Sequence, residues 1–253
     1  MNEPVVVPVE NLTEEPYAKV LCYPRASEAE VQTRLNELQK HGVKALEFAG
    51  KASVFNVPVL GKGFVGVAVI AHLNGQRAAL KIRRVDADRV GLQHEAAMLA
   101  KANSVNVGPK LISASTNFLL MQFIDGDLLP SWLETHKEKK HVNSVLREVL
   151  EQCWRLDATG LDHGELSKAP KHVIVSKEQK PFIVDFETAS ANRKPANVTA
   201  MCQYLFASTG SVARMTAEAL GEKSFKELID ALKVYKHDRT RGNFERLLQV
   251  CFA

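Results

Sequence analysis

The spacing of apolar residues changes near residue 125, and this change constrains the fold more than any other feature of the chain. Between residue 44 and about residue 82, apolar residues lie in short Val- and Phe-rich runs broken by glycines, as is typical of β-strands, and two more such runs follow a single helical stretch before residue 125. Beyond Asp125-Gly126-Asp127 they recur at helical spacing. The segregation predicts an α+β fold with a β-rich lobe at residues 1–124 and an α-helical lobe at 125–253.

Capping and turn residues place the individual elements. Ser27 and Glu30 form a capping box, which predicts a helix over 27–41 that ends before Gly42. Asn74-Gly75 predicts a hairpin turn between strands at 67–70 and 78–82. We expect a helix at 89–103, with Asp86 and Asp88 as candidate caps, and further helices at 142–159, 198–207, 212–220, 225–235 and 243–250. The further strands are expected at residues 110–113, 118–124, 173–176 and 182–184.

Composition excludes several classes of protein. The formal net charge of +4 over 253 residues is too small to indicate a nucleic-acid partner by itself. The longest apolar stretch, around residues 64–73, is shorter than the roughly 18 residues that a membrane span needs, so we expect no membrane partner. The cysteines form no C-x-x-C pair and are expected to be reduced core thiols of a cytoplasmic protein; they are Cys22, Cys153, Cys202 and Cys251.

A glycine-rich string precedes the strand at 67–70. Gly61, Gly63 and Gly66 form a G-x-G-x-x-G pattern, and a turn without Cβ atoms can bring backbone N–H groups close to phosphate oxygens. Because a strand rather than a helix follows, the string is not a dinucleotide-binding fingerprint. Taken alone, it is also compatible with a simple bend or bulge in the sheet.

Two charged residues fall at positions that should be buried. Lys81 lies inside an apolar strand, where a long cationic side chain often reaches the sheet edge. Glu95 shares a helix face with Leu92 and Leu99, and an unpaired carboxylate there would cost several kcal/mol. The pattern therefore predicts that Lys81 is the partner of Glu95.

Three further segments lie where functional residues are often found. The loop 161–166 contains His163 and Glu165, although a solvated turn would also explain either residue. Asp185 ends the apolar strand at 182–184, where an Asp is often only a turn cap. The apolar run 118–126 leads into the expected lobe junction, either as a core strand or as a hinge whose backbone meets a purine.

The order and spacing of these features resemble the protein-kinase-like superfamily over about residues 60–190. The His-Gly-Glu-Leu loop at 163–166 and the Asp-Phe-Glu triplet at 185–187 look similar to the atypical RIO and KEOPS-complex kinases. Together with the segment 193–199, they look closest to a predicted Ser/Thr protein kinase group of archaea and bacteria. The resemblance implies a bilobal kinase-like fold with a β-rich N-lobe, a reduced α-helical C-lobe, and ATP and Mg²⁺ as cofactors.

The resemblance also assigns a nucleotide-binding role to residues of the first half. Lys81, held by Glu95, would contact the α- and β-phosphates of ATP. The other implied nucleotide contacts are Gly61, Gly63 and Gly66 over the phosphates, Met121 behind the adenine, and the backbones of Gln122 and Ile124 at its edge.

The implied catalytic residues lie in the second half, where the sequence departs from the family pattern. Asp185 would hold Mg²⁺, and Glu165 occupies the position of the catalytic Asp. In the family, a metal-binding Asn lies five positions after the catalytic Asp. Here His172, seven positions after Glu165, looks like its equivalent after a two-residue insertion, although an imidazole is a poor Mg²⁺ ligand. Lys168 is a candidate for neutralising charge on the transferred phosphoryl group, or a solvated basic turn. Gly164 stands where the family has an arginine that pairs with a phosphorylated activation loop, so control by loop phosphorylation is not expected.

The main functional expectation is an ATP- and Mg²⁺-dependent transfer of phosphate to a protein Ser or Thr. Two alternatives remain open: a kinase of the same fold that acts on a small molecule, and an ATP-binding pseudokinase or ATPase scaffold. Basic residues between 223 and 246 are interspersed with acidic ones, so RNA proximity is a secondary possibility.

Overall fold

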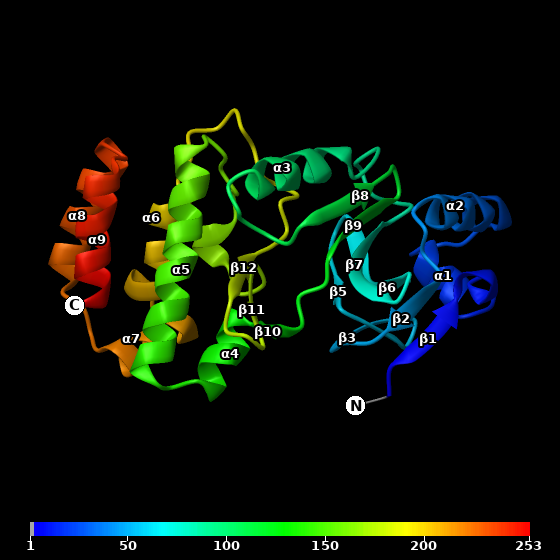
Figure 1. The fold of residues 1–253 in the computed structure, drawn as a ribbon, viewed down its shortest axis with the longest axis horizontal. Coiled ribbons are helices and arrows are strands. Elements are labelled where there is room, and N and C mark those ends of the chain that lie inside the picture. The colour runs from blue at the N-terminus through cyan, green and yellow to red at the C-terminus, as the bar shows by residue number, and fades with distance from the viewer. Residues whose placement is uncertain (1–2) are drawn as a thin grey trace. The chain divides into compact units, whose positions relative to one another are not determined.

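The structure is a computed structural model that describes residues 3–253 (Figure 1). It contains helices and an antiparallel sheet, which confirms the expected α+β class. By its internal contacts the chain forms two compact units. They comprise Met1–Ala97 with Lys110–Phe123, and Met98–Pro109 with Ile124–Ala253.

The first unit is built on an antiparallel sheet of seven strands. The strand order is β1-β2-β6-β7-β9-β8, and β5 also pairs with β6. The strands are β1 (Val5–Pro8), β2 (Ala45–Phe48), β5 (Gly61–Lys62), β6 (Gly66–Leu73), β7 (Gln76–Arg83), β8 (Leu111–Ala114) and β9 (Phe118–Gln122). The remaining elements are the hairpin β3 (Ala52–Val54) and β4 (Val57–Val59), the 3-10 turn η1 (Val9–Asn11), α1 (Tyr17–Leu21), α2 (Glu28–Lys40) and the start of α3 (Gln93–Asn103).

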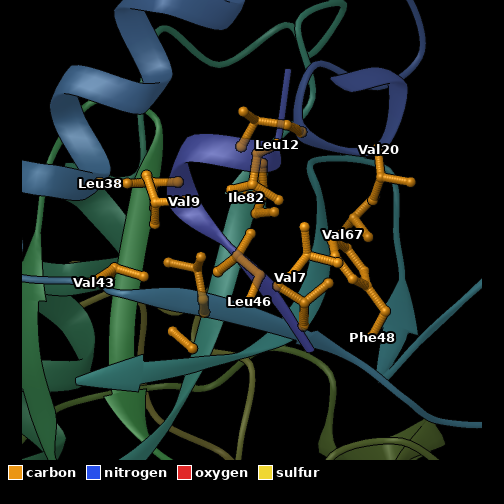
Figure 2. Packing of buried hydrophobic residues seen from close by; sticks show 14 of the residues in the cluster. Val7, Val9, Leu12, Val20, Leu38, Val43, Leu46, Phe48, Val67 and Ile82 are labelled. Atoms are coloured by element: carbon orange, nitrogen blue, oxygen red, sulfur yellow. The ribbon is translucent and has the colours of Figure 1, made fainter. Parts of the chain in front are cut away.

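The core of this unit lies between the sheet and the N-terminal helices. Figure 2 shows Leu38 of α2 and Val20 of α1 pointing into the same cluster as Leu46, Val67 and Ile82 of the sheet. Each of these side chains is at most 2% exposed. The N-terminal segment is therefore an integral part of the sheet's core.

A buried arginine connects α2 to the sheet through hydrogen bonds. The Arg34 side chain is fully buried and its guanidinium donates to the backbone carbonyls of Leu21 and Arg83, at 2.8 and 2.6 Å. It also donates to Glu30 at 2.7 Å and to the Asn117 side chain at 3.3 Å. Because a buried charge is tolerated only when it is paired and hydrogen-bonded, this set of contacts fixes the helix in one position.

Replacing Arg34 should therefore destabilise the protein strongly. We expect Arg34→Met to lower the free energy of unfolding by about 3–5 kcal/mol, since it leaves a carboxylate and several buried acceptors without their donor. Lys40→Met, on the exposed side of the same helix, should stay within about 0.5 kcal/mol of the wild type. Urea denaturation followed by circular dichroism measures both. Equal midpoints for the two variants would contradict the role given to Arg34.

Most predicted elements of the first unit are confirmed, and the differences have local causes. Ser27 caps α2 by accepting from the N–H of Glu30, and Asn74-Gly75 turns β6 into β7. The helix expected at 89–103 begins only at Gln93, because the N–H of Leu92 donates to Thr116 O. Asp86 is not its cap, since its carboxylate is paired with Arg84. The strand expected at 118–124 ends at Gln122, and β1 was not predicted.

The second unit is mainly helical. Its helices are α4 (Leu129–Thr135), α5 (Lys139–Ala158), α6 (Asn197–Cys202), α7 (Ser211–Leu220), α8 (Phe225–His237) and α9 (Arg241–Phe252), besides the end of α3. The other elements are the 3-10 turn η2 (Leu166–Lys168), the π-helical turn η3 (Gln203–Ala207) and a sheet of β10 (Gly126–Leu128), β11 (Val173–Ser176) and β12 (Pro181–Ile183). The long helix α5, green in Figure 1, contacts α6, α7, α9 and β12.

The helical pattern of this half is largely confirmed. The expected helix 142–159 begins three residues earlier, and the expected helix 198–207 is α6 continued by η3. The short helix α4 was not predicted. All four cysteines are free and buried, as expected. Among residues 3–253, none of the helices has both the length and the apolar character that spanning a membrane requires.

Candidate functional site

The glycine-rich string is the turn of a β-hairpin in the first unit. β5 pairs with the start of β6, and the N–H of Gly63 donates to Gly66 O at 2.8 Å. Phe64 lies at the tip and is 94% exposed. A Cβ at Gly61 would meet no atom within 4 Å, and one at Gly63 would touch only Gly66 O at 3.8 Å. The first two glycines thus leave open space beside the backbone.

Gly66 is different because the neighbouring strand leaves no room for a side chain. A Cβ at this position would lie 2.8 Å from Ile82 O and 3.0 Å from Cγ of Lys81. The third glycine therefore allows the stem of Lys81 to pass close to the backbone of β6. A glycine at position 66 is thus needed to make room for Lys81, whereas a simple bend or bulge in the sheet would not need that room.

Lys81 and Glu95 form the ion pair that the sequence predicts. Lys81 lies on β7 between Ala68 of β6 and Leu119 of β9. Its Nζ is 2.8 Å from Oε2 of Glu95, which lies in the first turn of α3. The side chains are 12% and 4% exposed, respectively. Water screens such a pair only weakly, so it holds the ammonium in a defined position.

The residues expected near adenine lie at the end of β9. Met121 pairs with Ala79 of β7 and packs against the small cluster that contains Val65 and Ala96. The N–H of Gln122 donates to Lys110 O at 2.8 Å, so this group is already used within the first unit. Ile124 lies just beyond β9, in the second unit. Their contact with a purine remains a prediction.

In the second unit, the hairpin of β11 and β12 brings His172 and Asp185 together. Val173 pairs with Ile183, and the N–H of Val184 donates to His172 O at 3.0 Å. The antiparallel ladder therefore sets the residue before β11 beside the residues after β12. Asp185 has φ +68°, a left-handed conformation that Asp tolerates better than most residues and that ends the strand.

His163 supports this strand end from the loop at 161–166. Its ring is fully buried, and Nε2 donates to Val184 O at 3.0 Å, next to Asp185. Burial, with a smaller contribution from the nearby His172, lowers the pKa of His163 to about 4. The ring is therefore neutral at pH 7, with its proton on Nε2. His163 acts as a positioning residue for Asp185.

The pKa of His163 predicts a loss of stability in acid. The unfolded chain protonates this ring below its ordinary value of 6.5, whereas the folded protein does so only near 4. Its stabilising contribution is thus present above pH 6.5 and is lost as the pH falls toward 4. The full change amounts to about 3 kcal/mol.

Two measurements check this value. In the presence of a chelator, the free energy of unfolding of the wild type should fall by about 3 kcal/mol more than that of His163→Gln between pH 7 and pH 4. NMR titration of the ring protons should give a midpoint near 4. An ordinary midpoint near 6.5, with equal acid losses in both proteins, would show that the ring is not buried in neutral form.

Glu165, His172 and Asp185 form a cluster that can hold a metal ion. Their donor atoms lie within 4.8 Å of one another, and Oε2 of Glu165 is 3.1 Å from Nε2 of His172. Ligands in adjacent octahedral positions about 2.1 Å from a metal are about 3 Å apart, so this spacing fits a divalent cation. Carboxylate oxygens suit Mg²⁺, whereas an imidazole nitrogen favours Mn²⁺ over Mg²⁺. The side chain of Lys168, the fourth expected catalytic residue, lies outside the described part of the structure.

Sequence reasoning missed the residues that hold this loop in place. Asn197 accepts from the N–H of His163 at 2.8 Å and donates to Leu161 O and to Asp157. Arg193 donates from Nε to Asp162 at 2.8 Å. Asp157 could have been found from the sequence, because it is a carboxylate on the apolar face of α5, four residues after Cys153. Glu95 was found on α3 by the same kind of signal. For Asn197 and Arg193 the signal was only the resemblance of segment 193–199.

Comparison with known families identifies the class of the protein. The model of the RIO domain matches residues 71–202, about half of the chain, and the chain belongs to this family. RIO domains are atypical kinase-like, ATP-binding phosphotransferases. The match includes Lys81, Glu95, Glu165, His172 and Asp185, but begins after the glycine-rich string.

The chain is also similar to an individual archaeal protein. The chain is 30% identical, over 118 residues, to an uncharacterized protein of the archaeon Methanocaldococcus jannaschii. The alignment covers 46% of this chain and 98% of that protein. The alignment therefore spans nearly all of that protein, whose name states no activity.

Proposed function

We propose that this protein transfers the γ-phosphoryl group of ATP to a Ser or Thr hydroxyl of another protein. The observation that carries the proposal is the ion pair of Lys81 and Glu95 in the first unit. A buried ion pair is weak evidence for stability, because two apolar residues would serve the core at least as well. Binding the phosphates of ATP, in contrast, requires a cation at a fixed position, and in a family that binds ATP the paired Lys81 supplies one.

Each unit has its own part in the proposed reaction. In the first, Lys81 neutralises the α- and β-phosphates, and the backbone around Gly61 and Gly63 covers them. In the second, Glu165 accepts the proton of the acceptor hydroxyl. The hydroxyl oxygen forms a bond to the γ-phosphorus, the bond from that phosphorus to the bridging oxygen breaks, and ADP leaves with the electron pair.

The chain also offers ligands for the divalent cation that ATP carries. Asp185 and His172 would hold the ion, with Glu165 next to them. When bound, such a cation neutralises negative charge on the phosphates as they react. His163 keeps Val184 and Asp185 in place, and its neutral ring adds no positive charge that would repel the cation.

The loop around Glu165 does not need a phosphorylated partner to become ordered. Gly164 has φ +91°, and a Cβ there would lie 2.5 Å from Nη2 of Arg193. Arg193 therefore fills the space that a side chain at position 164 would take, and it donates to Asp162 and to Thr188 O. This supports the expectation that loop phosphorylation does not control the enzyme.

The destination of the labelled phosphate tests the proposal. The full-length protein is incubated with γ-labelled ATP, Mg²⁺ or Mn²⁺, and a mixed protein acceptor, and products are separated by size and phosphoamino-acid analysis. We expect label on protein Ser or Thr. Label only in free phosphate would replace the proposal with an ATPase, and label only in a metabolite extract would indicate a small-molecule kinase.

A further inference from the structure

A hollow of about 460 Å³ lies in the second unit beside the loop that carries Glu165. It is lined by the loop at 162–167, the first turn of α6 and one face of α8. Its volume falls in the range of about 300–1,000 Å³ that ligand pockets occupy. Gly164 and Leu166 both line it, so the hollow reaches the residues on either side of Glu165.

The walls of the hollow combine apolar and cationic surface. Leu166 and Leu232 are buried residues of its lining, and Ala200 also lines it. Lys233 and Lys236 of α8 also line it, and both are exposed. A ligand that fits these walls has an apolar group flanked by negative charge.

The carboxylates of Asp162 and Asp230 do not cancel this positive charge. Asp162 is the one carboxylate among the lining residues, and it is already paired with Arg193 at 2.8 Å and bonded to the N–H of Ala196 at 3.0 Å. Asp230 contacts Lys233 at 3.6 Å, but both side chains are largely exposed. An exposed pair of this kind is worth at most about 1 kcal/mol and is readily exchanged for a ligand.

We propose that this hollow binds the protein acceptor as a short acidic segment, with an apolar residue next to the Ser or Thr. The inference rests on the proposed function, because it places the acceptor hydroxyl at Glu165. A peptide is favoured over a nucleic acid because the lining contains no aromatic side chain on which a base would stack. The apolar part of the lining is also better suited to an aliphatic side chain than to a sugar or phosphate.

The test uses the full-length protein and a short peptide in which a serine, with a leucine beside it, is flanked by glutamates. We expect Lys233→Glu/Lys236→Glu to raise the KM of this peptide about tenfold or more, since two attractive charges become repulsive. The same variant should prefer an analogue with lysines in place of the glutamates. Lys226→Glu is the control for a charge reversal as such, because it reverses the charge of one lysine on α8 outside the hollow.

Peptide binding without ATP, measured by fluorescence anisotropy, separates this inference from the proposed function. Binding that depends on Lys233 and Lys236 but leads to no phosphorylation would overturn the proposed function alone. If the KM for phosphorylation of the peptide were as little changed in the double variant as in Lys226→Glu, the inference alone would be overturned. Displacement of the peptide by a single-stranded oligonucleotide at equal or lower concentration would also overturn it, in favour of a nucleic-acid ligand.

Discussion

The variant Lys81→Met is expected to transfer phosphate about 10²–10³-fold more slowly than the wild type, because it removes a preorganised cation from the phosphates. It should also lower the free energy of unfolding by about 3–5 kcal/mol. The second effect follows from Glu95, which is 3% exposed and loses the ammonium that compensates its charge at 2.8 Å. Single-turnover transfer from labelled ATP and urea denaturation measure the two effects.

Lys44→Met is the control for this prediction. Lys44 is exposed in the same unit, so its replacement removes one charge without touching the ion pair. We expect its transfer rate and stability to match the wild type. A Lys81→Met protein that is destabilised as expected but transfers phosphate at the wild-type rate would mean that the lysine serves only the fold.

The variant Asp185→Asn is expected to lose about 10³-fold in phosphoryl transfer, since a metal ligand supplies several kcal/mol of charge stabilisation. Asn accepts the left-handed conformation of this position as readily as Asp, so the backbone at φ +68° is preserved. The variant removes the charge and little else. Mn²⁺ binding, followed by electron paramagnetic resonance, should weaken in parallel.

His172→Asn is the matched variant at the same cluster, and its effect should differ in kind. An amide oxygen replaces the imidazole nitrogen, so the ratio of Mn²⁺ to Mg²⁺ affinity should fall. If Asp185→Asn bound Mn²⁺ as tightly as the wild type, the cluster of Glu165, His172 and Asp185 would not be the metal site. An unchanged ratio in His172→Asn would remove only the imidazole from the ligand set.

Local signals in the sequence predicted those parts of the molecule that depend on neighbouring residues. The capping box at Ser27 and the turn at Asn74-Gly75 are examples, because each is stabilised within a few residues. The pairing of Glu95 with Lys81 was also predictable, since a carboxylate on an apolar helix face requires a cation.

Contacts between residues far apart in the sequence were not predictable in this way. The start of α3 is set by a hydrogen bond from Leu92 to Thr116, and α2 is fixed by contacts of Arg34 with Arg83 and Asn117. The support that Asn197 gives to His163 likewise spans 34 residues. Such contacts depend on tertiary packing, which overrides local preference.

The double variant Lys81→Met/Glu95→Leu gives the most direct test of the account. It replaces the ion pair by apolar side chains, and such replacements are often neutral or stabilising by about 1–4 kcal/mol. We predict a protein at least as stable as the Lys81→Met single variant, and close to the wild type, that still transfers almost no phosphate from ATP. Phosphoryl transfer near the wild-type rate by this folded double variant would contradict the claim that the pair exists to hold a lysine on the phosphates of ATP.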